Sequence, residues 1–163
     1  MRHAFYFVLL PLLAFSLFSC AALPSALAPS ARSAADRLDL AEAVFRYQFE
    51  HNASGSQKNC DYFFICIERE DPSPELLRRF ADNKPKVVPA SDATSSGRGV
   101  SHKTLGGTGL LFTISDITWL NDNTADVDGG YYEANLSSSG NTYRVERRDG
   151  KWIVTKNTMH WIS

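Results

Sequence analysis

The sequence predicts an α+β fold, in which an N-terminal amphipathic helix and a second short helix pack on a curved antiparallel sheet of four to five strands. Three observations predict it. Apolar residues recur at helical spacing after Asp36, a helix-start signal stands at Ser73, and from Gly109 onward the chain has the pattern of consecutive β-strands. Helices that precede a run of strands are typical of the α+β class. The two helices are then the available cover for the apolar face of the sheet.

The first helix is expected to begin at Asp36, whose side chain suits an N-cap position. Leu38, Ala41, Phe45 and Phe49 then fall on one stripe. Such a stripe is typical of an amphipathic helix that packs one face on a core. The pattern fades in the polar, glycine-containing stretch that follows.

The middle of the chain is expected to contain a strand, a short helix and a long loop. Tyr62–Ile67 is short, apolar and aromatic, which predicts a strand. Ser73 as N-cap with Pro74 at the first helical position predicts the second helix. Lys86–Pro89 is expected to be a brief edge segment. The polar, Gly- and Ser-rich residues 91–107 are expected to form the longest loop of the domain.

The last part of the chain is expected to form a four-stranded antiparallel meander. Its strands are expected at residues 110–120, 125–136, 142–148 and 151–156, with a turn at 137–141 and a short final strand or edge at 159–163. A bulge is expected near Ser115–Asp116, because the apolar alternation changes phase there. Asp149-Gly150 is a strong signal for a two-residue hairpin turn.

The alternation in the second of these strands also predicts which side chains face the core. Val127, Gly129 and Tyr131 share one face, and Asp126 and Asp128 share the other. We expect the apolar set to face the core and the two carboxylates to lie in water. Glu133 and Asn135 continue the Tyr131 face and are candidate pocket groups.

The first twenty residues predict an export signal. A short basic start precedes an apolar run of about fifteen residues, which is shorter than the roughly twenty that a membrane-spanning helix needs, and Pro11 interrupts it. We interpret residues 1–19 as a signal peptide, residues 20–35 as a flexible tether rich in Ala, Ser, Pro and Leu, and residues 36–163 as a single folded domain.

The end of the signal, Leu17-Phe18-Ser19-Cys20, resembles the lipobox of bacterial lipoproteins, although Phe18 is larger than the residue that the pattern prefers. The resemblance implies cleavage before Cys20 and lipid attachment to it, so the domain would face the periplasm from a membrane of the cell envelope. The alternative is ordinary secretion after cleavage at Ala21 or Ala22.

Composition excludes some classes of partner and site. The chain has 17 basic and 18 acidic side chains, so no basic excess points to nucleic acid.

Cys60 and Cys66 stand at the two ends of an apolar run. If this run is extended, its ends lie about 20 Å apart, whereas a disulfide needs Cα atoms within about 7 Å. Either the run turns back on itself or both thiols stay free; we favour Cys66 as a buried apolar residue. No metal site and no cofactor are expected.

The order of elements from Asp36 to Ile162 resembles the cone-shaped superfamily typified by nuclear transport factor two and ketosteroid isomerase, also described as cystatin-like. The resemblance is carried by the leading helix, the long strand pair through Trp119 and Tyr131, and the closing Asp149-Gly150-Lys151-Trp152 hairpin. The stretch Val127-Asp128-Gly129-Gly130-Tyr131-Tyr132 is also similar to small exported bacterial proteins with no assigned function.

The resemblance implies a pocket between the concave sheet face and the helices. The candidate pocket residues are Trp119, His102, Tyr131, Glu133 and Asn135. Members of the superfamily use this pocket for catalysis, for small ligands or for docking partners, so the fold does not decide the function. No catalytic residue of the isomerase branch can be matched to this chain.

Motifs for catalysis are not found in the sequence. Residues 97–104 look like a phosphate-binding loop, but His102 stands where that motif needs Gly. His51, His102 and His160 lack a metal-binding spacing and are interpreted as surface or structural residues. We therefore expect a non-catalytic, lipid-anchored envelope domain that binds a small ligand or an envelope protein. The alternatives are an enzyme of isomerase or hydrolase type that uses the pocket through Glu133 and a histidine, and a self-associating module that forms a homodimer.

Overall fold

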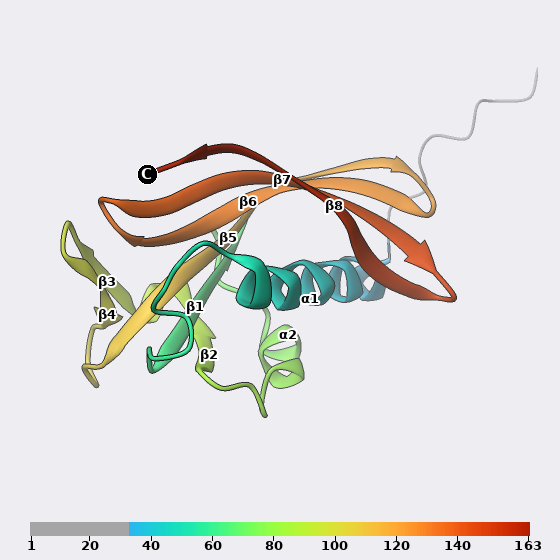
Figure 1. Ribbon diagram of the computed structural model, residues 1–163. Coiled ribbons are helices and arrows are strands. Elements are labelled where there is room, and N and C mark those ends of the chain that lie inside the picture. Colours follow the sequence, from blue (N-terminus) through green and yellow to red (C-terminus); the bar gives the residue numbers. More distant parts are fainter. Residues whose placement is uncertain (1–32) are drawn as a thin grey trace, which may run out of the picture. The chain divides into compact units, whose positions relative to one another are not determined.

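The computed structural model describes residues 33–163, which belong to one compact unit (Figure 1). The expected signal peptide, Cys20 and most of the expected tether lie outside the described residues. In chain order the elements are α1 (Ala34–His51), β1 (Tyr62–Ile67), α2 (Pro74–Arg79), β2 (Lys86–Pro89), the 3-10 helix η1 (Ala90–Asp92), β3 (Ala93–Ser96), β4 (Gly99–His102), β5 (Thr108–Asn121), β6 (Thr124–Ala134), β7 (Ser137–Arg148) and β8 (Lys151–Ile162).

The fold is α+β, as predicted, but its sheet is mixed. The main sheet has the strand order β2-β1-β5-β6-β7-β8 and is not closed. Strands β5 to β8 form the predicted antiparallel meander. Strand β1, however, runs parallel to both β2 and β5, so the expectation of a purely antiparallel sheet is wrong. The segment containing α2 makes the crossover that the parallel β1–β2 pair requires.

Several local predictions are confirmed. The bounds of β1 and β2 agree with the sequence signals. Ser73 caps α2 by accepting a hydrogen bond from the Leu76 amide at 3.2 Å. The register of β5 shifts between Ile114 and Asp116, where the bulge is expected. Asp149 and Gly150 have φ angles of 50° and 77°, as a two-residue hairpin turn of this kind requires.

Two polar segments were wrongly predicted as irregular. Residues 91–107 are not one long loop, because they contain η1 and the β3–β4 hairpin. Of these strand residues only Val100 is buried, so the hairpin lacks an apolar alternation. Residues 137–141 are not a turn but the beginning of β7. Strand β8 likewise runs without a break from Lys151 to Ile162, where two separate segments were expected.

Helix α1 begins earlier than predicted. Ser33, not Asp36, is its N-cap, and the Ser33 hydroxyl accepts a hydrogen bond from the Asp36 amide at 3.0 Å. Asp36 lies in the first turn and forms an ion pair with Arg147 on β7. The face turned to the core carries six buried residues: Leu40, Ala41, Val44, Phe45, Gln48 and Phe49. No helix within residues 33–163 is long and apolar enough to cross a membrane.

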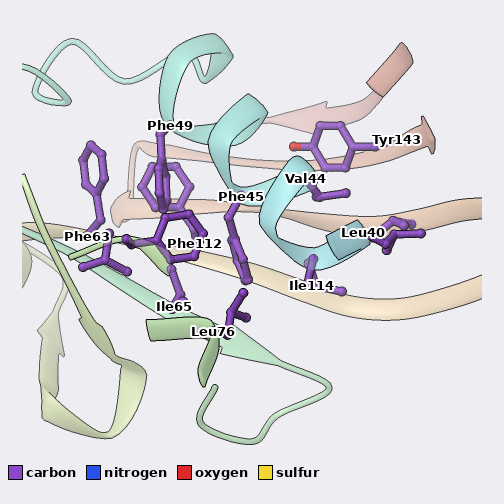
Figure 2. Close-up of a cluster of buried hydrophobic side chains, with 14 of the residues drawn as sticks. Leu40, Val44, Phe45, Phe49, Phe63, Ile65, Leu76, Phe112, Ile114 and Tyr143 are labelled. Carbon is purple, nitrogen blue, oxygen red and sulfur yellow. The ribbon is translucent and has the colours of Figure 1, made fainter. Parts of the chain in front are cut away.

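The space between α1 and the sheet is filled by aromatic side chains. Figure 1 shows α1 lying between strands β6–β8 and helix α2. Figure 2 shows the rings of Phe45, Phe49, Phe63 and Phe112 gathered in one cluster. The ring centre of Phe112 lies 5.0 Å from that of Phe49 and 5.1 Å from that of Phe63, with nearly perpendicular ring planes in the second case. The core of the domain therefore occupies the position where the resemblance implies a pocket.

The other face of the sheet is covered only in part. Phe64, Val88 and Val100 form a small second cluster beneath the β3–β4 hairpin. The predicted sidedness of β6 is confirmed for Val127 and Tyr131, which are buried, and for Asp128, which is exposed. Asp126, also expected in water, is half-buried and forms an ion pair with Arg144. Beyond the hairpin, this face carries Asp128, Gly130 and their cross-strand neighbours, which form the site described next.

Candidate functional site

The residues predicted to share one pocket lie in several places. Tyr131 is buried on the α1 side of the sheet. Trp119 packs edge-on against Trp152, with ring centres 5.6 Å apart. His102 lies 5.0 Å from the ring centre of Tyr62, beside the second cluster. Asn135 accepts a hydrogen bond from the Tyr132 hydroxyl at 3.2 Å. The structure brings only Tyr131 close to Glu133, through the hydroxyl of Ser137.

Glu133 is held by three serine hydroxyls. Ser54 and Ser137 donate to one carboxylate oxygen at 2.6 and 2.7 Å, and Ser56 donates to the other at 2.5 Å. Burial works to raise the pKa of Glu133, but the three hydroxyl donors outweigh it, and the net pKa lies below its usual value. The carboxylate thereby fastens the segment after α1 to the β6–β7 hairpin.

We expect the Glu133→Gln variant to lose stability at neutral pH and to lose part of the acid sensitivity of the wild type. The folded state holds Glu133 ionised at a pKa below 4.5, so this carboxylate contributes stability above pH 4.5 that disappears as the pH falls through the folded-state pKa. Urea unfolding between pH 3 and pH 7 measures both effects. Glu50→Gln, on the exposed side of α1, is the matched control and should keep wild-type stability at neutral pH. A Glu133→Gln variant as stable as wild type at neutral pH would contradict this role.

The two cysteines of the domain are free and half-buried. Free thiols are one of the two alternatives that the sequence left open, and Cys66, which was expected to be buried, is only half-buried. Burial raises the pKa of Cys60 to about 11, and it also raises the pKa of Cys66. Both thiols therefore stay protonated at neutral pH, and a protonated thiol is a poor nucleophile and a poor metal ligand. Within residues 33–163, no group of three or more His, Cys, Asp or Glu side chains is placed to hold a metal ion.

A groove crosses the sheet on the face turned away from α1. The strand register aligns Thr113 of β5, Gly130 of β6, Gly140 of β7 and Trp161 of β8 in one row across the sheet. Because the two central members are glycines, neither of them contributes a side chain to the middle of this row. The resulting groove has a volume of about 600 Å³, within the range of about 300–1,000 Å³ that is usual for small-molecule sites.

Trp161 lies on the glycine floor. A Cβ atom placed on Gly140 would come within 2.2 Å of the indole Nε1 and 2.6 Å of Cε2, so the ring rests directly over this residue. Trp161 is nevertheless 54% exposed. One side of the indole is thus supported by the sheet while much of the ring remains accessible from the groove.

The rows of side chains on either side of the glycines form the walls. Tyr132 and its cross-strand partner Ser138 stand on one side, and Asp128 and its partner Thr142 stand on the other. The Tyr132 hydroxyl donates to the carbonyl oxygen of Ser96 at 3.3 Å, which ties this wall to the β3–β4 hairpin. The groove is therefore bounded by aromatic rings and by short polar side chains.

Asp128, Thr142 and His160 form a hydrogen-bonded chain along one wall. The register of β8 shifts between the Gly140–Trp161 and Asn141–Met159 pairs, so His160 is an extra residue and its ring reaches Thr142. The Thr142 hydroxyl donates to Asp128 and lies 2.7 Å from Nε2 of His160. Since the single hydroxyl proton goes to Asp128, we assign a proton to Nε2, which donates to Thr142. Nδ1 is then the ring nitrogen left for other partners.

Comparisons of the chain with known protein families, curated proteins and solved structures find no match. The groove is therefore interpreted from its own chemistry.

Sequence reasoning missed this groove. It assigned Asp128 to solvent and treated His160 as a surface or structural residue, and it did not consider Trp161 as a site residue. The available signal was the pair of strand glycines, Gly130 and Gly140, because a glycine inside a strand often marks a close approach of a ligand or of another backbone. Only the register of two strand pairs, β6–β7 and β7–β8, shows that these glycines and Trp161 are neighbours.

Proposed function

We propose that this protein is a non-catalytic binding module of the bacterial cell envelope, which holds a small ligand or an envelope partner in the groove that Trp161 lines. The observation that carries the proposal is the indole of Trp161 lying on Gly140 beside Gly130, which adds no side chain to the groove. An accessible aromatic ring next to a few directed polar groups is the usual make-up of a binding site. In the core, by contrast, the aromatic rings pack against one another.

Catalysis by the groove has less support. In a Ser-His-Asp site, the histidine accepts the proton of the hydroxyl. Here the Thr142 hydroxyl donates to Asp128, and His160 donates to Thr142, so the histidine is not placed to activate the hydroxyl. The enzyme alternative also needs Glu133 beside a histidine, whereas the hydrogen bonds of Glu133 come from three serines.

Saturation-transfer NMR of the full chain against a library of small neutral compounds tests the binding proposal. We expect hits whose signal is lost in the Trp161→Ala variant, because this change removes the aromatic support of the groove. The exposed Ile153→Ala variant on the same strand is the matched control and should retain them. Hits that persist in Trp161→Ala would contradict the proposal. A hit whose own spectrum changes on incubation with protein would instead favour the enzyme alternative.

Export and lipid attachment at Cys20 are a second part of the proposal, supported by the signal and lipobox pattern of the sequence. Anchoring would place the groove at the membrane surface of the periplasm. We expect Cys20→Ala to move the protein from the membrane fraction to the soluble fraction, because the acyl chains supply the membrane affinity. Cys60→Ala is the matched control and should remain with the membrane. A mature protein that begins at residue 22 or 23 and carries no lipid, measured by mass spectrometry, would support ordinary secretion instead.

A further inference from the structure

We infer that the groove binds a neutral saccharide, with one sugar ring stacked on Trp161 and its hydroxyls bound by the Asp128–Thr142–His160 chain. This inference rests on the proposed function, because it names the ligand class of the same site. Three features of the groove carry it: its charge, its aromatic platform and the spacing of its polar groups.

The charge of the groove disfavours anionic ligands. Its lining contains one carboxylate, Asp128, and one histidine, His160, and it contains neither lysine nor arginine. Phosphate and carboxylate ligands are usually held by such cations or by helix N-termini, and the floor of this groove is made of strands. The lining therefore suits an uncharged ligand that is rich in hydrogen-bonding groups.

The aromatic platform suits a ring with one apolar face. The indole rests over Gly140 and over half of the Trp161 surface stays exposed. A pyranose carries C–H bonds on one face and hydroxyls around its rim. The positively polarised C–H groups meet the negative face of an aromatic ring, and the contact removes apolar surface from water. If Gly140 were replaced by a residue with a flexible aliphatic side chain, that side chain would occupy the space under the indole and tilt the ring.

The polar groups lie where the rim of such a ring would reach them. Asp128 and Thr142 occupy the row next to the Gly130–Gly140 row, two residues away along each strand. At about 3.3 Å per residue the two rows are about 6.6 Å apart, which is the scale of one sugar ring. Asp128 accepts hydrogen bonds, while His160 keeps Nδ1 available beside it. On the opposite wall, Ser138 adds a hydroxyl. An apolar ligand would take water from these groups without offering new hydrogen bonds in return, at a cost in free energy.

Isothermal titration calorimetry of the purified full chain tests the inference, with N-acetylglucosamine trimer, cellotriose and maltotriose as probes. We expect at least one trisaccharide to bind with a Kd of about 1 mM or tighter. Trp161→Ala should weaken this binding at least about tenfold, as the loss of a central aromatic contact does. Gly140→Ala should weaken it as well, because the added methyl group displaces the indole while Trp161 is retained. Asp128→Asn tests the polar wall and should also reduce affinity.

The control is Ile153→Ala, which changes an exposed side chain of β8 and should bind the trisaccharide as wild type does. Thermal unfolding of each variant checks that the loss of binding is not a loss of fold. Absence of binding for all three probes, or binding that Trp161→Ala leaves intact, overturns the saccharide inference. If neutral compounds of another class still bind the groove by NMR and lose that binding in Trp161→Ala, the proposed function stands and only the ligand class is wrong.

Discussion

Replacing Phe112 by alanine is expected to lower the free energy of unfolding by about 3–5 kcal/mol. Phe112 is fully buried and lies at the centre of the aromatic cluster, between Phe49 and Phe63. Alanine would leave a cavity against side chains from α1 and β1, which belong to different parts of the fold. These elements are held by the sheet and by α2, so they cannot collapse fully into the space. Urea unfolding followed by circular dichroism measures the change, and the slope m should stay that of the wild type.

The control for Phe112→Ala is Leu136→Ala. Leu136 is 88% exposed, and truncation of an exposed side chain usually changes stability by less than about 0.5 kcal/mol. A loss below about 1.5 kcal/mol for Phe112→Ala would mean that the cluster is loosely packed. In that case the space between α1 and the sheet would again be a candidate for the pocket that the superfamily resemblance implies.

Replacing Gly130 by alanine is expected to destabilise the domain by about 1–3 kcal/mol or more, as over-packing of a rigid interior does. A Cβ atom at this position would lie 1.9 Å from the carbonyl oxygen of Ser139. That oxygen belongs to the backbone of β7, so relief of the clash requires the two strands to separate. Because β6 and β7 are central strands of the meander, their separation would weaken hydrogen bonds on both sides. Thermal and urea unfolding measure the loss.

Gly140→Ala is the matched control for Gly130→Ala, because the two glycines face each other across β6 and β7. A Cβ atom on Gly140 would meet the indole of Trp161 at 2.2 Å, and this exposed side chain can rotate away. Glycine also weakens a strand interior relative to alanine, by roughly 0.5–1 kcal/mol. We therefore expect Gly140→Ala to be about neutral for stability while it displaces Trp161. Equal destabilisation by the two variants would contradict the geometry described for the glycine row.

Local signals in the sequence predicted much of the fold. The cap at Ser73, the apolar run of β1 and the Asp149-Gly150 turn each depend on a few adjacent residues, and each is found where expected. The pairing of β1 with β5 joins Tyr62 to Gly109, and no short-range pattern specifies such a contact. The mixed character of the sheet follows from that pairing. It could not be predicted from periodicity, which reports only the two faces of each strand.

Composition misled the prediction wherever polar residues form strands. The beginning of β7 contains Ser138, Ser139 and Asn141, which are buried at 7% exposure each. They are tolerated because their side chains bind one another and their neighbours: Ser139 donates to Asn141 at 2.8 Å, and Asn141 donates to Asn157 at 2.8 Å. Serine and asparagine in sequence resemble a turn, so only the tertiary hydrogen bonds distinguish the two cases.

The last strand has a consequence for the behaviour of the protein at high concentration. Strand β8 forms one edge of an open sheet over 12 residues, and long regular edges invite uncontrolled aggregation by adding further chains. Its register shifts at two places, and the exposed Lys156 lies between them. Irregular spacing and a charge on the edge prevent another chain from extending the sheet. Many copies at high local concentration would thus expose β8 without growing into fibrils.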